Sequence, residues 1–455
     1  DGTVKCIEDE IPFEVPEGWS WARLGSFFLT VTGSTPSTKD ASLYGTEYPF
    51  YKPTDLNAGY NVYCAEDSVS KKGYLSGRPL PKFSVLVTCI GATIGKTGYI
   101  SNAGICNQQI NAILPNSEIL PAYTYFCMCS QYEQQQICIN SSATTLPILN
   151  KSKFDNLLFP IPPKEQQSQI VDRIKSLLLF VENIQNNQET LKKTVAEAKS
   201  KILDLAIRGK LVPQDPNDEP ASVLIERIRA EKEELIKQGK IKRNKKESVI
   251  FKGDDNSYYL RTESKAIEIT NELPYKIPDS WEWAKIGDIF QVNPRNKIED
   301  LLEVSFIPMP LIDDGFSGKH TSEERVWRKV KSGFTHFMEG DIGIAKITPC
   351  FENRKSVIFK NLKNGYGAGT TELHILRPYE STILPEYVLA YVKSSMFISK
   401  GKQEFTGAVG QQRIGKDYLE NSYFPIPPLE EQVRIVEQIS TVYKQLNMIS
   451  DASLV

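Results

Sequence analysis

Two sets of polar residues in this sequence have side chains that could bind nucleic acid. The set in the first half combines hydroxyl, amide and ammonium groups and consists of Thr35, Lys39, Lys52, Lys71, Lys72, Lys96, Gln108 and Gln109. The set in the second half is Lys346, Arg354, Lys355, Gln411, Gln412 and Arg413. Ammonium groups bind phosphates, whereas Arg on guanine and Gln on adenine each make two hydrogen bonds to a base edge. These residues are therefore candidate DNA-binding residues, with a solvated surface loop as the open alternative for each.

The motifs of several enzyme classes are missing from the sequence. There is no G-x-S-x-G of serine hydrolases and no H-E-x-x-H of zinc proteases. The three histidines, His320, His336 and His374, are not paired at the spacing of metal ligands or catalytic bases. An Asn-Pro-Pro-aromatic sequence, the signature of methyltransferases that flip a base, is also absent. We therefore expect a non-catalytic protein that holds no metal and no cofactor.

One segment is similar to a phosphate-binding loop. Gly91-Ala92-Thr93-Ile94-Gly95-Lys96-Thr97 ends as a P-loop does, but the pattern G-x-x-x-x-G-K-[ST] needs glycine where Ile90 stands. Backbone N–H groups in such a loop could still bind a phosphate. We interpret the segment as a structural or DNA-phosphate turn and not as an ATP site.

The overall composition limits the class of protein. A chain of 455 residues has room for roughly three domains of ~150 residues, and 40% hydrophobic with 24% charged residues is typical of globular proteins. The net charge of −2 supplies no general attraction to nucleic acid, so any such site is a local patch. No apolar run reaches the ~18 residues of a membrane span, and the first residues lack a signal peptide, so we expect a cytoplasmic protein without membrane contact.

Cysteines and basic residues form no decisive motif. No C-x-x-C pair occurs, which favours reduced, mostly buried thiols over a zinc site. The cysteines are Cys6, Cys64, Cys89, Cys106, Cys127, Cys129, Cys138 and Cys350. The densest basic cluster is Lys240, Lys242, Arg243, Lys245 and Lys246. It is interpreted either as a solvated connector or as a phosphate-contacting tail.

The sequence repeats itself once. The segment around Trp19-Ser20-Trp21 returns as Trp281-Glu282-Trp283, and Ile119-Leu120-Pro121-Ala122-Tyr123 returns as Ile383-Leu384-Pro385-Glu386-Tyr387. Phe159-Pro160-Ile161-Pro162-Pro163 likewise returns as Phe424-Pro425-Ile426-Pro427-Pro428. Three anchors in one order at nearly one offset indicate two related halves of about 260 residues. Because the sequence between the anchors differs, we expect the halves to do one job on different targets.

The anchors themselves indicate structure. In Trp-x-Trp both indoles would lie on one face of a strand, and we favour core packing over ligand stacking. Pro162 and Pro163 precede a helix, where a proline at the first position costs no hydrogen bond. Strand-like runs at residues 84–88 and 303–307 and short helical segments near Tyr123 and Tyr387 indicate a mixed α/β fold for each half.

A long heptad pattern follows each half. After Pro163 the apolar positions advance by alternating steps of four and three, interrupted only by Gln188: Ile170, Ile174, Leu177, Val181, Ile184, Leu191, Val195, Ala198, Ile202 and Leu205. This spacing predicts a coiled-coil helix over residues 164–208, which Gly209 ends, and a second helical stretch over 221–238. The phase returns at Ile435, Ile439, Val442, Leu446 and Ile449. There the sequence stops about twenty residues earlier than in the first copy, so we expect a truncated helix or one completed by a partner.

Together these motifs resemble the specificity subunit of type I restriction-modification systems over essentially the whole chain. The likeness rests on the opening Pro-x-Gly-Trp-x-Trp, on the closing Pro-Ile-Pro-Pro-x-Glu-x-Gln of each half, and on the long helix after each. Gly340-Asp341-Ile342, Lys346-Ile347-Thr348-Pro349, Thr371-Glu372 and Arg377-Pro378 also look like that family's target recognition domains.

The resemblance implies an α/β fold with two target recognition domains joined by long antiparallel coiled-coil helices. The two recognition domains would be residues 1–163 and 271–428. Residues 164–270 would form a long helix, a linker, a second helix and a basic connector. The C-terminal heptad helix would be residues 429–455. It implies a non-catalytic subunit that recognises a bipartite sequence in double-stranded DNA. Its partners would be modification subunits that methylate adenine and a restriction subunit that translocates and cuts DNA.

Two other classes of function stay open on the sequence alone. One is an enzyme, such as a fused methyltransferase. The other is a coiled-coil scaffold that binds proteins without sequence-specific DNA binding.

Overall fold

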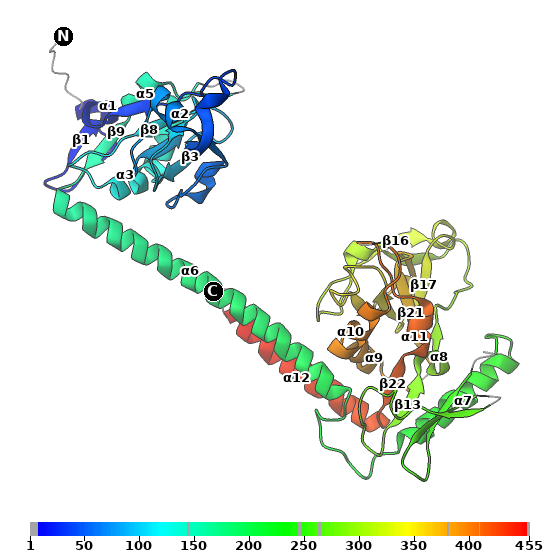
Figure 1. Ribbon diagram of the computed structural model, residues 1–455. Helices are drawn as coiled ribbons and strands as arrows, with labels where there is room; N and C mark the ends of the chain where they lie inside the picture. The colour runs from blue at the N-terminus through cyan, green and yellow to red at the C-terminus, as the bar shows by residue number, and fades with distance from the viewer. Residues whose placement is uncertain are drawn as a thin grey trace. The chain divides into compact units, whose positions relative to one another are not determined.

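The structure is a computed structural model of residues 1–455 that describes residues 8–142, 146–243, 247–262, 265–379, 382–408 and 410–452. Cys6, Lys245 and Lys246 lie outside the described residues. The chain divides into two compact units, Asp1–Gln185 and Asn186–Val455 (Figure 1). The helix α6 (Lys164–Ala206) runs from one unit into the other. The sequence predicts a domain boundary at residue 163, which places α6 in a segment separate from the first recognition domain. This boundary stays a prediction.

The described part of the first unit contains three small sheets with short helices between the strands. Their strand orders are β1-β9, β4-β3-β7 and β2-β8-β5-β6. The strands are β1 (Ser20–Arg23), β2 (Thr30–Thr32), β3 (Tyr44–Tyr51), β4 (Asp67–Val69), β5 (Val85–Thr88), β6 (Thr97–Tyr99), β7 (Ile105–Cys106), β8 (Ile110–Ile113) and β9 (Leu158–Ile161). The helices are α1 (Leu24–Phe27), α2 (Lys71–Ser76), α3 (Pro121–Met128), α4 (Gln131–Asn140) and α5 (Lys151–Asp155).

The second unit repeats this plan and adds to it. Its sheets have the orders β13-β22, β16-β15-β20-β17, β14-β21-β18-β19 and β10-β11-β12. The strands are β10 (Val249–Lys252), β11 (Tyr258–Arg261), β12 (Ala266–Glu268), β13 (Glu282–Lys285), β14 (Phe290–Val292), β15 (Glu303–Ile307), β16 (Glu323–Val326), β17 (Thr335–Met338), β18 (Ile342–Ala345), β19 (Ser356–Ile358), β20 (Tyr366–Gly369), β21 (Leu373–Pro378) and β22 (Tyr423–Ile426). The helices are α7 (Ala221–Lys237), α8 (Ile286–Ile289), α9 (Pro385–Val392), α10 (Ser395–Gln403), α11 (Lys416–Asn421) and α12 (Leu429–Ala452).

The two units share one topology. The pair β1-β9 corresponds to β13-β22, with Trp21 opposite Pro160 in the first and Trp283 opposite Pro425 in the second. Among the named strands that the structure describes, each unit has one parallel pair, β3 with β7 and β15 with β20, and the other pairs are antiparallel. The central strands β5 and β18 are buried along their whole length, as expected for strands covered on both faces. The predicted α/β class and the internal repeat are confirmed.

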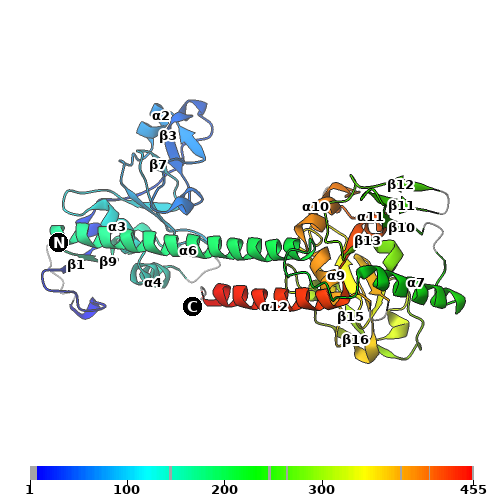
Figure 2. The same ribbon diagram turned by 90° about the horizontal axis from the view of Figure 1, so that it is seen from below.

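The predicted long helices are present. The helix α6 has 43 residues, which corresponds to about 65 Å at ~1.5 Å per residue, and it ends three residues before Gly209, whose φ is +66°. The helix α7 ends one residue before its predicted end. Ile207 and Ile435 belong to one hydrophobic cluster, while the Lys199 ammonium group donates to Asn447 Oδ1 at 2.6 Å. The C-terminal part of α6 and α12 therefore run antiparallel, side by side in both views (Figures 1 and 2).

The heptad seam is buried only along part of α6. Val195, in the second unit, is 6% exposed. In the first unit, Leu177, Val181 and Ile184 are 41–49% exposed. No helix among the described residues is both long enough and apolar enough to span a membrane.

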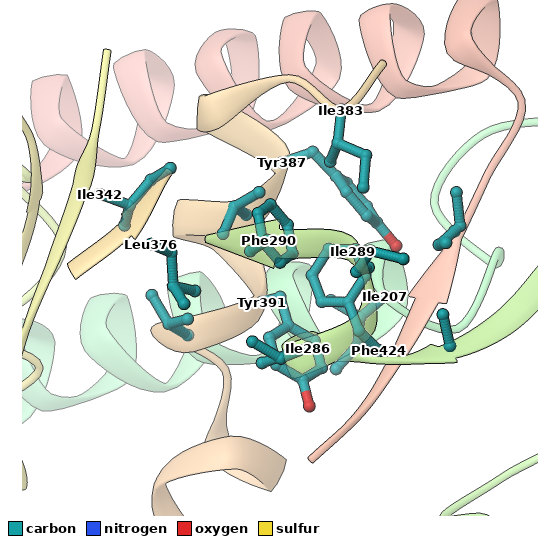
Figure 3. Packing of buried hydrophobic residues seen from close by; sticks show 14 of the residues in the cluster. Ile207, Ile286, Ile289, Phe290, Ile342, Leu376, Ile383, Tyr387, Tyr391 and Phe424 are labelled. Atoms are coloured by element: carbon teal, nitrogen blue, oxygen red, sulfur yellow. The ribbon is translucent and has the colours of Figure 1, made fainter. Parts of the chain in front are cut away.

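The main core of the second unit joins elements that are distant in sequence. Phe290 of β14, Tyr387 and Tyr391 of α9 and Phe424 of β22 point toward one another, with Ile207 beside them (Figure 3). Tyr391 and Phe424 have ring centroids 4.8 Å apart. The core thus fastens the first turn after α6 to the strands and helices of the second unit.

The anchors of the sequence repeat meet in one hydrogen-bond network at the base of each unit, which we call the anchor network. In the first unit the Trp19 indole donates to Gln166 Oε1 at 2.8 Å, Tyr123 donates to the Pro160 carbonyl, and Gln167 accepts from the Leu120 N–H. In the second, Trp281 donates to Glu431 Oε2 at 2.8 Å. Tyr387 and Gln432 repeat the remaining bonds with Pro425 and Leu384. The anchors are structural, and they fix where each long helix begins.

Two details differ from expectation. Trp281 lies one residue before β13, so it joins the main core, whereas Trp283 packs in a separate cluster with Ile250 and Leu260. The two indoles are therefore not neighbours on one strand face. Among the described cysteines, only Cys89 and Cys106 are buried, and Cys64, Cys129 and Cys138 are exposed. The expectation of mostly buried thiols was wrong, because five of the seven described cysteines lie in loops or on helix surfaces, where the side chain is exposed or half-exposed.

One buried acid in the first unit titrates far from its usual range. Glu133 of α4 is 0% exposed, and neither carboxylate oxygen has a hydrogen-bond partner among the described residues. Burial raises the pKa of this carboxyl to about 8. The folded unit therefore holds Glu133 as the neutral acid at neutral pH.

We expect Glu133→Gln to remove a pH dependence of stability. A carboxyl whose pKa is higher in the folded than in the unfolded state stabilises fully below its unfolded pKa, and this contribution is lost as pH rises toward about 8. Relative to the variant, the wild type should lose free energy of unfolding on the order of 2–3 kcal/mol between pH 5 and 8. Urea unfolding at both pH values measures this, with the exposed Glu66→Gln as control. Parallel wild-type and Glu133→Gln curves would contradict the assignment.

Candidate nucleic-acid interface

Several loops of the first unit meet at one edge of the sheet β2-β8-β5-β6. The Ser34 N–H donates to the Cys106 carbonyl, the Cys89 N–H to the Gln109 carbonyl and the Gly91 N–H to the Pro147 carbonyl. These bonds hold together the loop after β2, the β5–β6 loop, the turn before β8 and the segment before α5. We call this edge, and its counterpart in the second unit, the loop edge.

The first unit's loop edge brings three predicted residues close together. The Thr35 hydroxyl donates to Gln108 Oε1 at 2.6 Å. Asn107 donates to Gln109 Oε1 at 2.9 Å. In both contacts the glutamine oxygen is the acceptor, so the amide N–H groups of Gln108 and Gln109 are the ones directed to other acceptors. Thr35 and Gln108 are exposed, as a base-reading pair must be.

The predicted lysines of the first unit are spread over several elements. Lys52 forms an ion pair with Asp67, whose hydrogen bond raises the lysine pKa. Lys72 pairs with Asp40 at 3.0 Å. The hydrogen bond from Ser42, followed by that from Lys72, lowers the Asp40 pKa to about 2.

The side chains of the other three predicted lysines of this unit form no ion pair with a described residue. Lys96 donates to the neutral Asn57 Oδ1 at 2.7 Å. Lys39 and Lys71 are exposed and have no ion pair among the described residues. Among the predicted lysines of this unit, the ammonium groups of Lys39, Lys71 and Lys96 are therefore the most available to a phosphate.

The second unit builds its loop edge from the equivalent loops. The Lys346 N–H donates to the Glu372 carbonyl, the Thr348 N–H to the Gln412 carbonyl and the Ile414 N–H to the Lys346 carbonyl. Arg413 makes two hydrogen bonds to the Glu372 carboxylate, at 2.9 and 3.0 Å. This pairing lowers the Glu372 pKa. Lys346, Gln411, Gln412 and Arg413 thus gather at one place.

Besides Arg413, which donates to Glu372 and to the Gln411 carbonyl, two more predicted residues of the second unit use donors inside the protein. Arg354 donates to the Lys393 carbonyl at 2.8 Å and to the Ser200 hydroxyl of α6 at 3.1 Å, and its guanidinium lies over the Phe316 ring. Lys355 donates to the Met309 carbonyl at 3.0 Å. Arg354 joins the recognition fold to α6, so its contacts are structural, and its role toward DNA stays a prediction.

The structure adds residues that sequence reasoning missed. Asn293, at φ +55°, accepts from the Ile375 N–H, and its amide lies 3.3 Å from His374 Nδ1. Arg295 and Lys297 follow it in the loop after β14 and are exposed. This loop is the counterpart of the Thr35 to Lys39 loop, because β2 and β14 occupy the same place in their sheets. Aligning the two halves by their anchors would have pointed to it.

The glycine-rich segment at Gly91 joins two strands. Gly91 and Gly95 have φ values of +106° and +86°, and the chain continues into β6. A P-loop instead leads into a helix whose first N–H groups face the phosphates. The segment is a turn at the loop edge. Among the described residues no group of three or more His, Cys, Asp or Glu side chains is placed to hold a metal ion.

The sequence matches a known protein family over more than half of its length. The sequence model of the family described as "Type I restriction modification DNA specificity domain" matches residues 16–193 and 278–452. The chain belongs to this family. Each matched range contains one recognition fold and a long helix, so the internal repeat is a repeat of the family domain.

Curated relatives agree with this assignment. The EcoAI specificity subunit of Escherichia coli is 47% identical over 254 residues, and the EcoEI specificity subunit is 46% identical over 254 residues. In both cases the match covers 56% of this chain and 40% of the relative. The chain thus spans about two fifths of the length of the relatives it matches.

Solved structures show the same fold. The HsdS subunit of Thermoanaerobacter tengcongensis has a TM-score of 0.55 and 16% identity, with 97% of this chain and 93% of that chain covered. A chain from a structure of a type I restriction-modification system has a TM-score of 0.57 and 16% identity, with 97% and 94% covered. The mixed α/β recognition domains on long paired helices are therefore the fold of specificity subunits.

We expect Gly33→Ala to destabilise the first unit's loop edge. A Cβ at Gly33 would lie 2.2 Å from the Asn107 carbonyl oxygen and 2.3 Å from that of Cys106, and both are backbone atoms. Relieving the clash separates the loop after β2 from the turn before β8. The free energy of unfolding should fall by about 2–3 kcal/mol.

Thermal or urea unfolding measures the effect of Gly33→Ala. The control is Gly415→Ala, because a Cβ there would find its nearest atom at 4.0 Å. Equal stability of the two variants would show that the loops are not held together as described.

Proposed function

We propose that this chain is the DNA sequence-recognition subunit of a type I restriction-modification complex. Each unit reads one half of a split sequence in double-stranded DNA, and the chain acts as scaffold for modification subunits and a restriction subunit. The observation that carries the proposal is one fold used twice with different residues at the same loop edge. Membership of the specificity family supports it.

The differing loop edges supply different readout chemistry. The first presents amide and hydroxyl groups from Thr35, Gln108 and Gln109, whereas the second presents Lys346, Arg413 and two glutamines. Amides match the adenine edge and a guanidinium matches guanine. Two edges with unlike chemistry suit two unlike half-sites.

The long helix supplies a spacer and a docking surface. The helix α6 is continuous from the first unit into the second, so its length sets the separation of the two reading edges along the chain. The exposed apolar side chains Leu177, Val181 and Ile184 lie on its N-terminal half. Exposed apolar residues at heptad positions are suited to packing against a partner's helices. Methylation and cleavage belong to the partner subunits.

The same apolar positions support the second candidate, a coiled-coil scaffold without sequence-specific DNA binding. The two candidates differ in what the loop edges do. In the scaffold, substitutions at the loop edges leave every DNA interaction unchanged. In the recognition subunit, they change the sequence that is bound.

We expect loop-edge variants to alter one half-site at a time. Thr35→Ala/Gln108→Ala should relax selection in one half of the bound sequence, and Gln411→Ala/Gln412→Ala in the other. Losing one base contact lowers discrimination by roughly tenfold. Selection of duplexes from a random-sequence pool, by the chain purified with its modification subunit, measures this. Unchanged selection with both variants would favour the scaffold.

We expect an insertion in α6 to lengthen the gap between half-sites. Seven residues inserted after Gln188 keep the heptad phase and add about 10 Å, or about three base pairs. The same duplex selection reads the gap. Seven residues inserted in the turn between β10 and β11 serve as control and should leave the gap unchanged. An unchanged gap with the α6 insertion would contradict the role of α6 as a spacer.

A further inference from the structure

A basic cleft lies in the second unit between the end of α7 and the recognition fold. Its volume is about 920 Å³, and it is lined by the C-terminal end of α7 and the connector after it, by α8, β14 and the loop after β14, and by α11. Eight of its lining residues are Lys or Arg and three are Asp or Glu. This excess of positive charge stands out in a chain whose net charge is −2.

Several of these cations have no acidic partner among the described residues. Lys232 is paired with Glu247, Arg377 with Asp341 and Lys416 with Glu420. The remaining cations donate to neutral groups or form no ion pair with a described residue. Lys285 donates to Asn421 Oδ1 at 3.2 Å, and Arg295 to the Phe334 carbonyl at 2.9 Å.

Three lysines of the cleft, which we call the cleft lysines, are exposed and form no ion pair with a described residue: Lys240, Lys242 and Lys297. They come from two segments that are more than fifty positions apart in the sequence.

The connector that forms one wall is fixed to the core. The helix α7 packs through Leu224, Ile225 and Ile228 against the main core, and Ile241 packs against the same cluster. After Gly239, at φ +68°, the Lys240 N–H donates to the Leu235 carbonyl at 2.9 Å. Lys240 and Lys242 therefore flank an anchored residue. At these positions the basic cluster is held against the core and forms one side of the cleft, so it is not a free tail.

The cleft continues from the loop edge of the second unit. It includes Asn293, which contacts His374 and Ile375 at that edge, and Lys416, two residues after Ile414. The charges of Lys346 and Lys416 both act on His374 and help to lower its pKa, after the larger effect of burial. Positive charge thus extends from the predicted base-reading residues to the connector.

We propose that this cleft binds the phosphate backbone of duplex DNA outside the bases that the loop edge reads. The inference rests on the proposed function and extends it to the connector, which lies outside both recognition folds. A run of ammonium groups without partners, next to a base-reading edge, matches phosphates spaced along one strand. Among the described residues of the first unit no helix corresponds to α7, so the second half-site gains contacts that the first lacks.

The test neutralises the cleft lysines. Lys240→Gln/Lys242→Gln/Lys297→Gln removes three charges from the cleft. Each lost phosphate contact lowers the slope of log affinity against log salt by about 0.9, so we expect a decrease of about 2–3 in this slope and about tenfold weaker binding at 100 mM KCl. Fluorescence anisotropy with the full chain and a labelled 30-base-pair duplex, at several KCl concentrations, measures both.

The matched control removes three exposed lysines of the same unit that do not line the cleft: Lys265→Gln/Lys276→Gln/Lys329→Gln. An equal effect of both triple variants would show a general charge effect and would overturn the proposal that the cleft binds phosphates. If the wild type binds the duplex and the slope is unchanged in the cleft variant, the cleft proposal is overturned but the proposed function of the chain is not.

Two further outcomes separate this inference from the proposed function. Absence of any duplex binding by the wild type overturns the proposed function of the chain. If the cleft substitutions weaken binding of poly-glutamate but leave DNA binding unchanged, the cleft binds an acidic protein segment. This result would overturn the DNA proposal. Thermal unfolding of both variants confirms that each is folded.

Discussion

Each unit depends on the closure of its chain at the anchor network. The opening strand pairs with the closing strand, β1 with β9 and β13 with β22, and the tryptophan before the opening strand donates its indole N–H to the first turn of the helix that leaves the unit. Gln167 and Gln432 are almost fully buried, and each binds the turn before α3 or α9. A buried donor without its partner costs about 1–3 kcal/mol, so these bonds constrain both the fold and the direction of the helix.

Closure at the base leaves the opposite loops free to differ. The loops between the anchors can change length and residue type because the sheet order and the helix exit do not depend on them. The first unit has amides and hydroxyls at its loop edge, and the second has a guanidinium paired with Glu372 and an extra helix, α7, beside it. One frame with two sets of contacts is the physical basis of the proposed reading of two unlike half-sites.

The sequence predicted those features that depend on local spacing. The heptad steps predicted α6 to within two residues of its end, and the repeated anchors predicted the shared topology. Features that depend on contacts between distant segments were not predictable. Arg354 is half-buried and donates to Ser200 of α6, and the tryptophans of one Trp-x-Trp enter different clusters. Likewise, the placement of the basic connector in one cleft with Lys285 and Lys297 depends on the packing of α7 against the core. Residue types indicate which side chains could contact DNA, but the packing of the fold determines which of these side chains are exposed.

Two copies of one fold are proposed to read the two halves of one DNA site. The most direct test is to co-express the chain with its modification subunit, expose the complex to a random-sequence DNA pool, and map the methylated adenines. The account predicts a split motif, with two defined halves separated by a gap of fixed length. Methylation at a single undivided motif, or at adenines without a sequence preference while the complex is assembled, would contradict it.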